Sequence, residues 1–177
     1  MANDMKMISI LGSTGSIGTS SLNVISSLGD AYKVFGLSCH KNITLLQDQI
    51  HQFKPEYAII TDQSSYNLFL REHGKNLGDT KIYFGDEGLN IITSDKNVDT
   101  VIAAITGFSC IYPVISAINH NKTILIANKE ILVSAGDMII SQLRKSKAIM
   151  LPIDSEHNAL LQVILSSGLE YKINNAD

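Results

Sequence analysis

Short apolar runs alternate with segments of helical spacing along nearly the whole chain, and this alternation constrains the fold more than any other feature. The run Ile124–Ala127 is continuously apolar, as expected of a strand buried on both faces of a parallel sheet. Strands that alternate with helices form βαβ units with right-handed crossovers. We therefore predict an α/β fold: a doubly wound, Rossmann-like parallel sheet that binds ligands at the carboxyl ends of its strands. The expected strands are 7–11, 32–38, 57–61, 81–84, 98–104, 123–127 and 148–152.

Residues typical of helix boundaries support the segments between these strands. Gly29-Asp30 ends the first helical pattern, and Pro55 ends the second. Gly74 is expected at the C′ position of the third, and Pro113 suits the first turn of the fifth. The expected helices are 17–28, 43–53, 64–73, 87–93, 112–119, 130–146 and 156–165.

Composition excludes several classes of protein. The 177 residues are 45% hydrophobic, which is enough for a sizeable core, and the net charge of −3 without a basic stripe argues against nucleic-acid or membrane partners. Cys39 and Cys110 lack metal-binding spacing, so buried free thiols are expected. The first residues lack the apolar core of a signal peptide, and no apolar run reaches membrane-spanning length. These features favour the cytoplasm.

A glycine-rich segment, Gly12-Ser13-Thr14-Gly15-Ser16-Ile17-Gly18, joins the first strand to the first helix. Gly12 permits a tight turn, Gly15 lets the backbone approach phosphates, and Gly18 lets the helix pack close to the sheet. Free amides at the start of the helix would face an anion. The G-x-x-G-x-x-G spacing therefore indicates a dinucleotide site, although a strand–helix turn that binds nothing would also explain it.

The end of the second strand distinguishes between the two nicotinamide dinucleotides. An Asp or Glu at this point usually binds the free 2′-hydroxyl of NADH. This chain has Ser38-Cys39-His40-Lys41-Asn42 instead. Lys41 and Asn42 can bind a 2′-phosphate, which favours NADPH, while a solvated loop lysine is the alternative for Lys41.

Two further clusters of polar residues follow strands. In Asn128-Lys129-Glu130, Asn128 can cap the next helix and Glu130 suits its N-terminus; alternatively, Asn128 and Glu130 lie near a cofactor and Lys129 on a substrate. In Asp154-Ser155-Glu156-His157, the two carboxylates can converge on a hard divalent cation, with Ser155 donating to a substrate oxygen. Helix capping is the alternative there too. His157 is expected to be structural, because Mg²⁺ prefers oxygen ligands.

The motifs occur in the order found in a known enzyme family. Gly12–Gly18, Gly107, Lys122–Glu130 and Leu151–Asn158 together resemble 1-deoxy-D-xylulose 5-phosphate reductoisomerase, over nearly the whole chain. The resemblance implies an NADPH-binding Rossmann-like domain at 1–150 and the beginning of a catalytic, metal-binding domain at 151–177. It also implies a metal-dependent rearrangement of the sugar phosphate, followed by hydride delivery from NADPH. The product would be 2-C-methyl-D-erythritol 4-phosphate of isoprenoid biosynthesis.

The resemblance also implies roles for individual residues. Lys129, Ser155 and Glu156 would contact the substrate and carry the catalysis. Asp154 and Glu156 would bind Mg²⁺, Mn²⁺ or Co²⁺. The residues that would contact NADPH are Thr14, Gly15, Ser16, Ile17, Lys41, Asn42, Asn128 and Glu130.

The chain departs from the family pattern in two ways. His40 stands where the family commonly has glycine. The family also has a long further region with a third acidic metal ligand, the residues that bind the substrate phosphate, and a mobile flap, none of which can be located here. We therefore expect this chain to bind NADPH with little turnover, to have a loose tail at 168–177, and to correspond to a family whose full-length members are homodimers.

Two other classes of protein use similar features. A short-chain epimerase or dehydrogenase shares the glycine spacing but needs a Tyr-x-x-x-Lys pair, and none of the six tyrosines has a lysine four residues later. A non-enzymatic NAD-sensing domain would suit the short length. It would predict an acid after the second strand and would leave Asp154 and Glu156 without a role.

Overall fold

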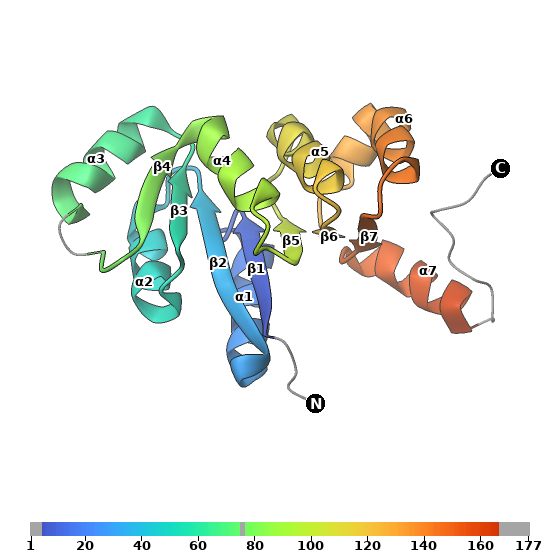
Figure 1. Ribbon diagram of the computed structural model, residues 1–177, viewed down its shortest axis with the longest axis horizontal. Coiled ribbons are helices and arrows are strands. Elements are labelled where there is room, and N and C mark those ends of the chain that lie inside the picture. Colours follow the sequence, from blue (N-terminus) through green and yellow to red (C-terminus); the bar gives the residue numbers. More distant parts are fainter. Residues whose placement is uncertain (1–4, 75–76, 167–177) are drawn as a thin grey trace.

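Seven parallel strands form one sheet in the computed structural model, which describes residues 5–74 and 77–166. The strands are β1 (Lys6–Leu11), β2 (Tyr32–Cys39), β3 (Tyr57–Ile60), β4 (Lys81–Phe84), β5 (Thr100–Ala103), β6 (Thr123–Ile126) and β7 (Ile149–Pro152). Their order across the sheet is β4-β3-β2-β1-β5-β6-β7, and every pair is parallel. Figure 1 shows β1 in the middle of the molecule, with β7 toward the carboxyl-terminal side. The predicted doubly wound α/β fold is confirmed.

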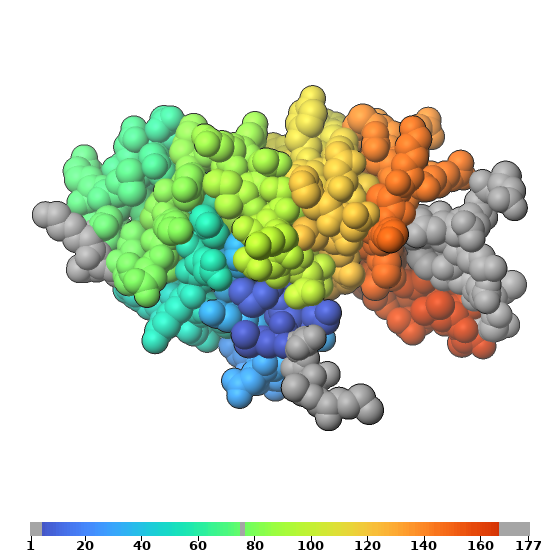
Figure 2. All heavy atoms as spheres, in the orientation of Figure 1, coloured from blue at the N-terminus to red at the C-terminus, as the bar shows by residue number. Residues whose placement is uncertain are grey.

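The helices form two layers, one on each face of the sheet. The first layer is α1 (Ser16–Ser27), α2 (Ile43–Phe53) and α3 (Gln63–His73), and the second is α4 (Gly85–Ser94), α5 (Ile111–Asn119) and α6 (Glu130–Arg144), with α7 (Ser155–Ser166) after β7. Buried side chains separate into two cores accordingly: one holds Leu22, Leu46 and Phe69, and the other holds Ile92, Val114 and Ile139. In Figure 2, atoms of α4 and α5 cover the middle of the second face. Among the described residues, no helix has both the length and the apolarity to cross a membrane.

The strand order places a crevice beside β1. The chain moves outward from β1 to β2, β3 and β4, and then returns to pair β5 with the other edge of β1. Because the connections leave β1 and β5 toward opposite faces, the loops after these strands diverge. The glycine-rich loop after β1 therefore lies where such sheets bind ligands.

The structure differs from the sequence-based expectations in a few details. Gly74 is the C-cap of α3, with φ −55° in the right-handed region, rather than the C′ residue that was expected. Helix α6 contains a break at Ala135, where φ is −132° and ψ is 18°. Short 3-10 turns at Gly29–Ala31 and Phe108–Cys110 were not expected from helical spacing. The tail at 168–177, expected to be loose, lies outside the described residues.

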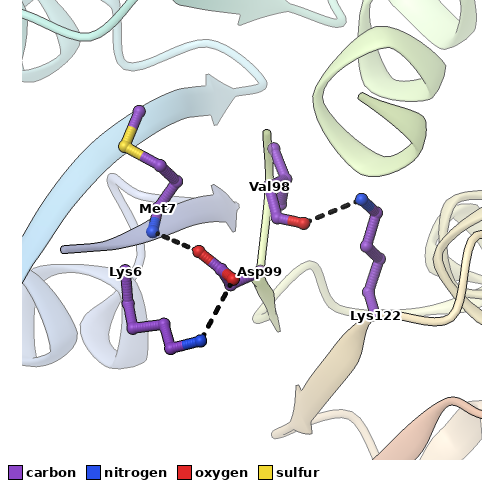
Figure 3. Close-up of polar contacts among 5 residues, drawn as sticks. All are labelled: Lys6, Met7, Val98, Asp99 and Lys122. Carbon is purple, nitrogen blue, oxygen red and sulfur yellow. Dashed lines mark hydrogen bonds and ion pairs between the residues drawn. The ribbon is translucent and has the colours of Figure 1, made fainter. Parts of the chain in front are cut away.

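A buried lysine ties the amino-terminal edge of the sheet together (Figure 3). The Lys122 Nζ atom donates to the Val98 carbonyl at 2.7 Å and to the Asp95 carbonyl, and only 6% of the residue is exposed. Next to it, Asp99 accepts from the Met7 amide at 2.8 Å and pairs with Lys6. Burial lowers the pKa of Lys122, although Asp95 and Asp99 partly oppose the shift.

We expect Lys122→Met to destabilise the chain by about 2 kcal/mol, because methionine fills the space but removes the Lys122 donor from two carbonyl oxygens, of which only that of Asp95 keeps another donor, the Val98 amide. Urea unfolding measures the effect. Lys147→Met is the matched control, since Lys147 is exposed and should change stability by less than about 0.5 kcal/mol. Equal stability of the two variants would contradict the role given to Lys122.

Both cysteines are buried free thiols, as predicted. Burial raises the pKa of each thiol to about 12, and a hydrogen bond with the Ile105 backbone partly offsets this for Cys110. Because the thiolate is the reactive form, neither residue should react with a thiol reagent in the native chain at pH 8, and both should react in denaturant. A rapid native-state reaction in an Ellman assay would show that one of them is accessible.

Candidate functional site

Two glycines in the loop after β1 are required by the packing of the protein itself. Gly12 has φ +82°, and a Cβ there would lie 2.9 Å from the Ala104 carbonyl oxygen. A Cβ on Gly18 would lie 2.3 Å from the Gly12 carbonyl oxygen. At Gly15 the nearest atom would be 3.4 Å away, an ordinary contact. The protein therefore requires glycine at positions 12 and 18, whereas at 15 it leaves room for a side chain.

Hydrogen bonds hold this loop against the end of β2 and against α2. The Gly12 amide donates to the Ser38 hydroxyl at 2.9 Å, and the Ser13 amide donates to the Ser38 carbonyl at 2.8 Å. The buried Ser13 hydroxyl donates to Gln49 Oε1 at 2.7 Å, and Gln49 Nε2 donates back to the Ser13 carbonyl at 2.9 Å. Sequence reasoning missed Ser38 and Gln49 as loop-positioning residues. The available signal was a glutamine three residues after Leu46, on the apolar face of α2.

The start of α1 is open toward the cleft. Gly15 is its N-cap, and no side chain caps the helix. A cleft of about 460 Å³ is lined by Gly12, Thr14 and Gly15, by residues after β2 and β3, and by Ala104, Ile105 and Thr106 after β5. Uncapped amides facing such a cleft suit an anionic ligand.

The other two predicted loop residues do not line this cleft with their side chains. Ser16 begins α1 and is exposed. The Ile17 side chain lies in a separate apolar groove beside the sheet, together with Ile8, Ile102 and Leu125. Only the backbone of Ile17 is therefore suited to contact a ligand at the loop.

His40 and Thr61 form a polar corner of the cleft, whereas Lys41 and Asn42, the next residues after β2, do not line it. His40 Nδ1 lies 3.0 Å from the Thr61 hydroxyl, and both residues line the cleft. Asn42 caps α2, because its Oδ1 accepts from the Leu45 amide at 3.2 Å. Lys41 is exposed, and its charge helps to lower the pKa of Asp62, after larger effects from hydrogen bonds with Ser64 and Ser65. The sequence missed this neighbouring carboxylate, because Asp62 follows β3 rather than β2.

The buried side chain of Asn128 connects the 105–107 loop after β5 to the start of α6 after β6. Its Nδ2 donates to the carbonyls of Ile105 at 2.7 Å and Gly107 at 2.8 Å. Its Oδ1 accepts from the amides of Glu130 at 2.9 Å and Ile131 at 3.3 Å. The Glu130 carboxylate also accepts from the Gly107 amide at 2.8 Å. Both residues thus hold the 105–107 loop, and Asn128 has the capping role that its position left open.

The acidic cluster lies after β7, next to Lys129. The Lys129 Nζ atom is 3.8 Å from Asp154 Oδ2, and the Ser155 hydroxyl donates to Glu156 Oε2 at 3.0 Å. The pKa of Glu156 is lowered to about 2, first by a hydrogen bond with the Asp154 carboxyl and then by its own amide, Ser155 and Lys129. The two carboxyl groups therefore lie close to each other, beside the Lys129 ammonium.

Two carboxylates are an incomplete ligand set. Within residues 5–74 and 77–166, no group of three or more His, Cys, Asp or Glu side chains could hold a metal ion. His157 instead lines an apolar hollow between α6 and α7, with Leu132 and Leu160. Oxygen ligands alone suit Mg²⁺ or Mn²⁺, and the remaining positions would need water or other ligands.

Comparisons with known proteins identify relatives of this chain. A 1-deoxy-D-xylulose 5-phosphate reductoisomerase from Clostridium kluyveri is 39% identical over 168 residues, which are 94% of this chain and 43% of the relative. That of Haemophilus ducreyi is 43% identical over 159 residues, covering 89% and 40%. The chain thus spans about two fifths of the length of the curated relatives that it matches.

Solved structures show the same similarity. A DOX-P reductoisomerase with fosmidomycin and magnesium has a TM-score of 0.88 at 38% identity, covering 93% of this chain and 41% of that one. The enzyme from Zymomonas mobilis with NADPH has a TM-score of 0.83 at 34% identity, covering 90% and 41%. The family model for 1-deoxy-D-xylulose 5-phosphate reductoisomerase matches residues 8–136. This chain belongs to the 1-deoxy-D-xylulose 5-phosphate reductoisomerase family.

Proposed function

We propose that this chain provides the NADPH site and part of the metal and substrate site of a reductoisomerase. The reaction would convert 1-deoxy-D-xylulose 5-phosphate to 2-C-methyl-D-erythritol 4-phosphate in isoprenoid biosynthesis. One observation carries the proposal: Asp154 and Glu156 converge beside Lys129, on the same edge of the sheet as the open start of α1. Family membership supports it, because similar solved structures contain NADPH or magnesium.

The glycine loop would hold the cofactor pyrophosphate through backbone amides at the start of α1. The protein leaves space for a Cβ at Gly15, so any need for glycine there would come from the ligand. Lys41 would bind the 2′-phosphate, and the 105–107 loop held by Asn128 would support the cofactor beyond the pyrophosphate. The proposed NADPH contacts are Thr14, Gly15, Ser16, Ile17, Lys41, Asn42, Asn128 and Glu130.

Asp154 and Glu156 would hold Mg²⁺, Mn²⁺ or Co²⁺. When bound, such an ion supplies a Lewis acid that polarises substrate oxygens. The Lys129 ammonium would place positive charge next to the same oxygens. Ser155 would donate either to the substrate or, as in this structure, to Glu156, and thereby orient that carboxylate.

The proposal includes limits on what the chain does alone. Two carboxylates leave a divalent ion mostly hydrated, so we propose weak metal binding and little turnover. We also propose that the NADPH-binding domain spans 1–150 and that a catalytic domain begins at 151, in a protein that is a homodimer at full length. Two reduced, buried thiols suit a cytoplasmic location.

Nucleotide titration tests the cofactor assignment. The purified chain should bind NADPH at least about tenfold more tightly than NADH, because a phosphate contact with lysine is a charge-assisted hydrogen bond. Lys41→Ala should reduce this preference about tenfold, whereas Lys54→Ala at the far end of α2 should keep it. A preference for NADH would favour a sensor domain instead.

A second measurement tests the proposal that this chain alone has little turnover. With NADPH, Mn²⁺ and 1-deoxy-D-xylulose 5-phosphate, the absorbance of NADPH should decay no faster than in the Asp154→Asn variant. Family-like turnover by the unmodified chain would show that its site is sufficient.

A further inference from the structure

His40 occupies the point of the cleft where the ribose 2′ group of a dinucleotide is expected. It is the first residue after β2. In doubly wound folds, residues at the end of this strand bind the ribose 2′ group. Its side chain is exposed and lines the cleft together with Gly12, Thr14 and Thr61. The family resemblance assigns a glycine to this position and therefore gives no role to an imidazole.

Thr61 lies where it can hold one nitrogen of the ring. The His40 Nδ1 atom is 3.0 Å from the Thr61 hydroxyl oxygen, and this hydroxyl lies 3.3 Å from the Cys39 carbonyl oxygen. Both nitrogens of a charged imidazole are donors, so Nδ1 of the charged ring would donate to Thr61, and the Thr61 hydroxyl would donate to Cys39. Nε2 of the charged ring would then donate to a ligand in the cleft.

The charges near His40 leave a phosphate short of positive partners. Lys41 is the next residue, and its charge acts on Asp62 after β3. Asp62 Oδ2 accepts from the Ser65 amide at 2.9 Å and the Ser65 hydroxyl at 2.8 Å, and also from the Ser64 hydroxyl. Asp86 at the start of α4 lines the same cleft, while the Cys39 thiol is buried. A 2′-phosphate beside His40 would therefore lie in a cleft lined by the Asp86 carboxylate, and the adjacent Lys41 charge is shared with Asp62.

We infer that His40 is a specificity-determining residue for the 2′-phosphate of NADPH, an inference that rests on the proposed function. The ring, held at Nδ1 by Thr61, takes up one proton from solvent when the phosphate binds, so that both ring nitrogens are donors. The resulting imidazolium donates to a phosphate oxygen beside Lys41. NADH lacks this phosphate, so its binding takes up no proton at His40.

The test compares the unmodified chain with His40→Asn and His40→Gln by calorimetry at pH 6 and pH 8. The Asn amide stands near the position of Nδ1 and keeps the Thr61 contact without a charge. The Gln amide reaches the position of Nε2, also without a charge. At pH 6 both variants should bind NADPH roughly tenfold more weakly than the unmodified chain, the size of one charge-assisted hydrogen bond. The difference should shrink at pH 8, and NADH affinity should be unchanged.

The design separates this effect from ionisation of the phosphate, which is common to all three proteins. Calorimetry in buffers of different ionisation enthalpy should show greater proton uptake with NADPH for the unmodified chain than for either variant. Equal NADPH affinities, or equal losses for NADPH and NADH, would overturn the role of His40. If the unmodified chain bound neither nucleotide, the proposed function itself would fail, and this inference with it.

Discussion

Gly18→Ala should destabilise the chain by at least about 3 kcal/mol, near the upper end of the usual cost of overpacking. The new methyl group would lie 2.3 Å from the Gly12 carbonyl oxygen and 2.6 Å from Ser13 Cα. Both neighbours are backbone atoms, which no side-chain rotation can move away. The loop and α1 must therefore separate, which should also abolish nucleotide binding in the surviving folded fraction. Urea unfolding and NADPH titration measure the two effects.

Gly136→Ala is the matched control. This glycine lies within α6, and a Cβ there would meet nothing within 4 Å. Alanine is the better helix former, so stability should stay the same or rise by up to about 1 kcal/mol. If both variants lost the same stability, the cost at position 18 would reflect a general sensitivity to glycine replacement rather than the contact between α1 and the loop.

Asn128→Asp should cost about 3 kcal/mol or more at pH 7, with almost no change of shape. A carboxylate oxygen would replace the amide Nδ2 that now donates to the carbonyls of Ile105 and Gly107. Two hydrogen bonds would be lost, and a buried negative charge would face two carbonyl oxygens. Loosening of the 105–107 loop should weaken NADPH binding together with stability.

The destabilisation caused by Asn128→Asp should increase with pH. An introduced acid in this position would have a pKa raised above its unfolded value by burial and by the facing carbonyls. The destabilisation should therefore be small below the unfolded pKa and grow as pH rises through the folded pKa. Asn23→Asp, on the exposed side of α1, should change stability by less than about 0.5 kcal/mol at pH 7. A cost for Asn128→Asp that is the same at pH 4 and pH 7 would rule out the proposed repulsion.

The fold was predictable because the alternation of strands and helices is strong and local. Continuous apolar runs such as Ile124–Ala127 indicated strands covered on both faces, and the structure places this run in and just after β6. Turn and cap geometry was less predictable. Gly74 was expected at the C′ position of α3, but it is the C-cap itself, with φ −55°. A glycine in the sequence allows a left-handed backbone at that position, but it does not show that the surrounding chain adopts one.

Spacing alone did not decide the role of the acidic cluster. Asp154 and Glu156 stand two residues apart just after β7, a spacing that favoured helix capping, and it was the family resemblance that implied a shared cation. The contacts of Asn128 with the 105–107 loop, and of Ser13 with Gln49, join segments more than 20 residues apart. The strand order brings these segments together in space, and the local sequence of either segment does not indicate which distant residues it contacts. The same holds for Asp62 beside Lys41.

The order of the strands also sets the distance between the glycine loop and the acidic cluster. From β1, where the glycine loop begins, to β7, where the acids follow, there are three steps across the sheet through β5 and β6. At about 4.8 Å per step, the two ends lie about 14 Å apart. A dinucleotide anchored at the first point would deliver its redox ring to the second only if stretched across the tops of the intervening strands. Compact nucleotides, or those with a shorter second half, would fall short of the carboxylates. The sheet would in this way select its cofactor by span as well as by charge.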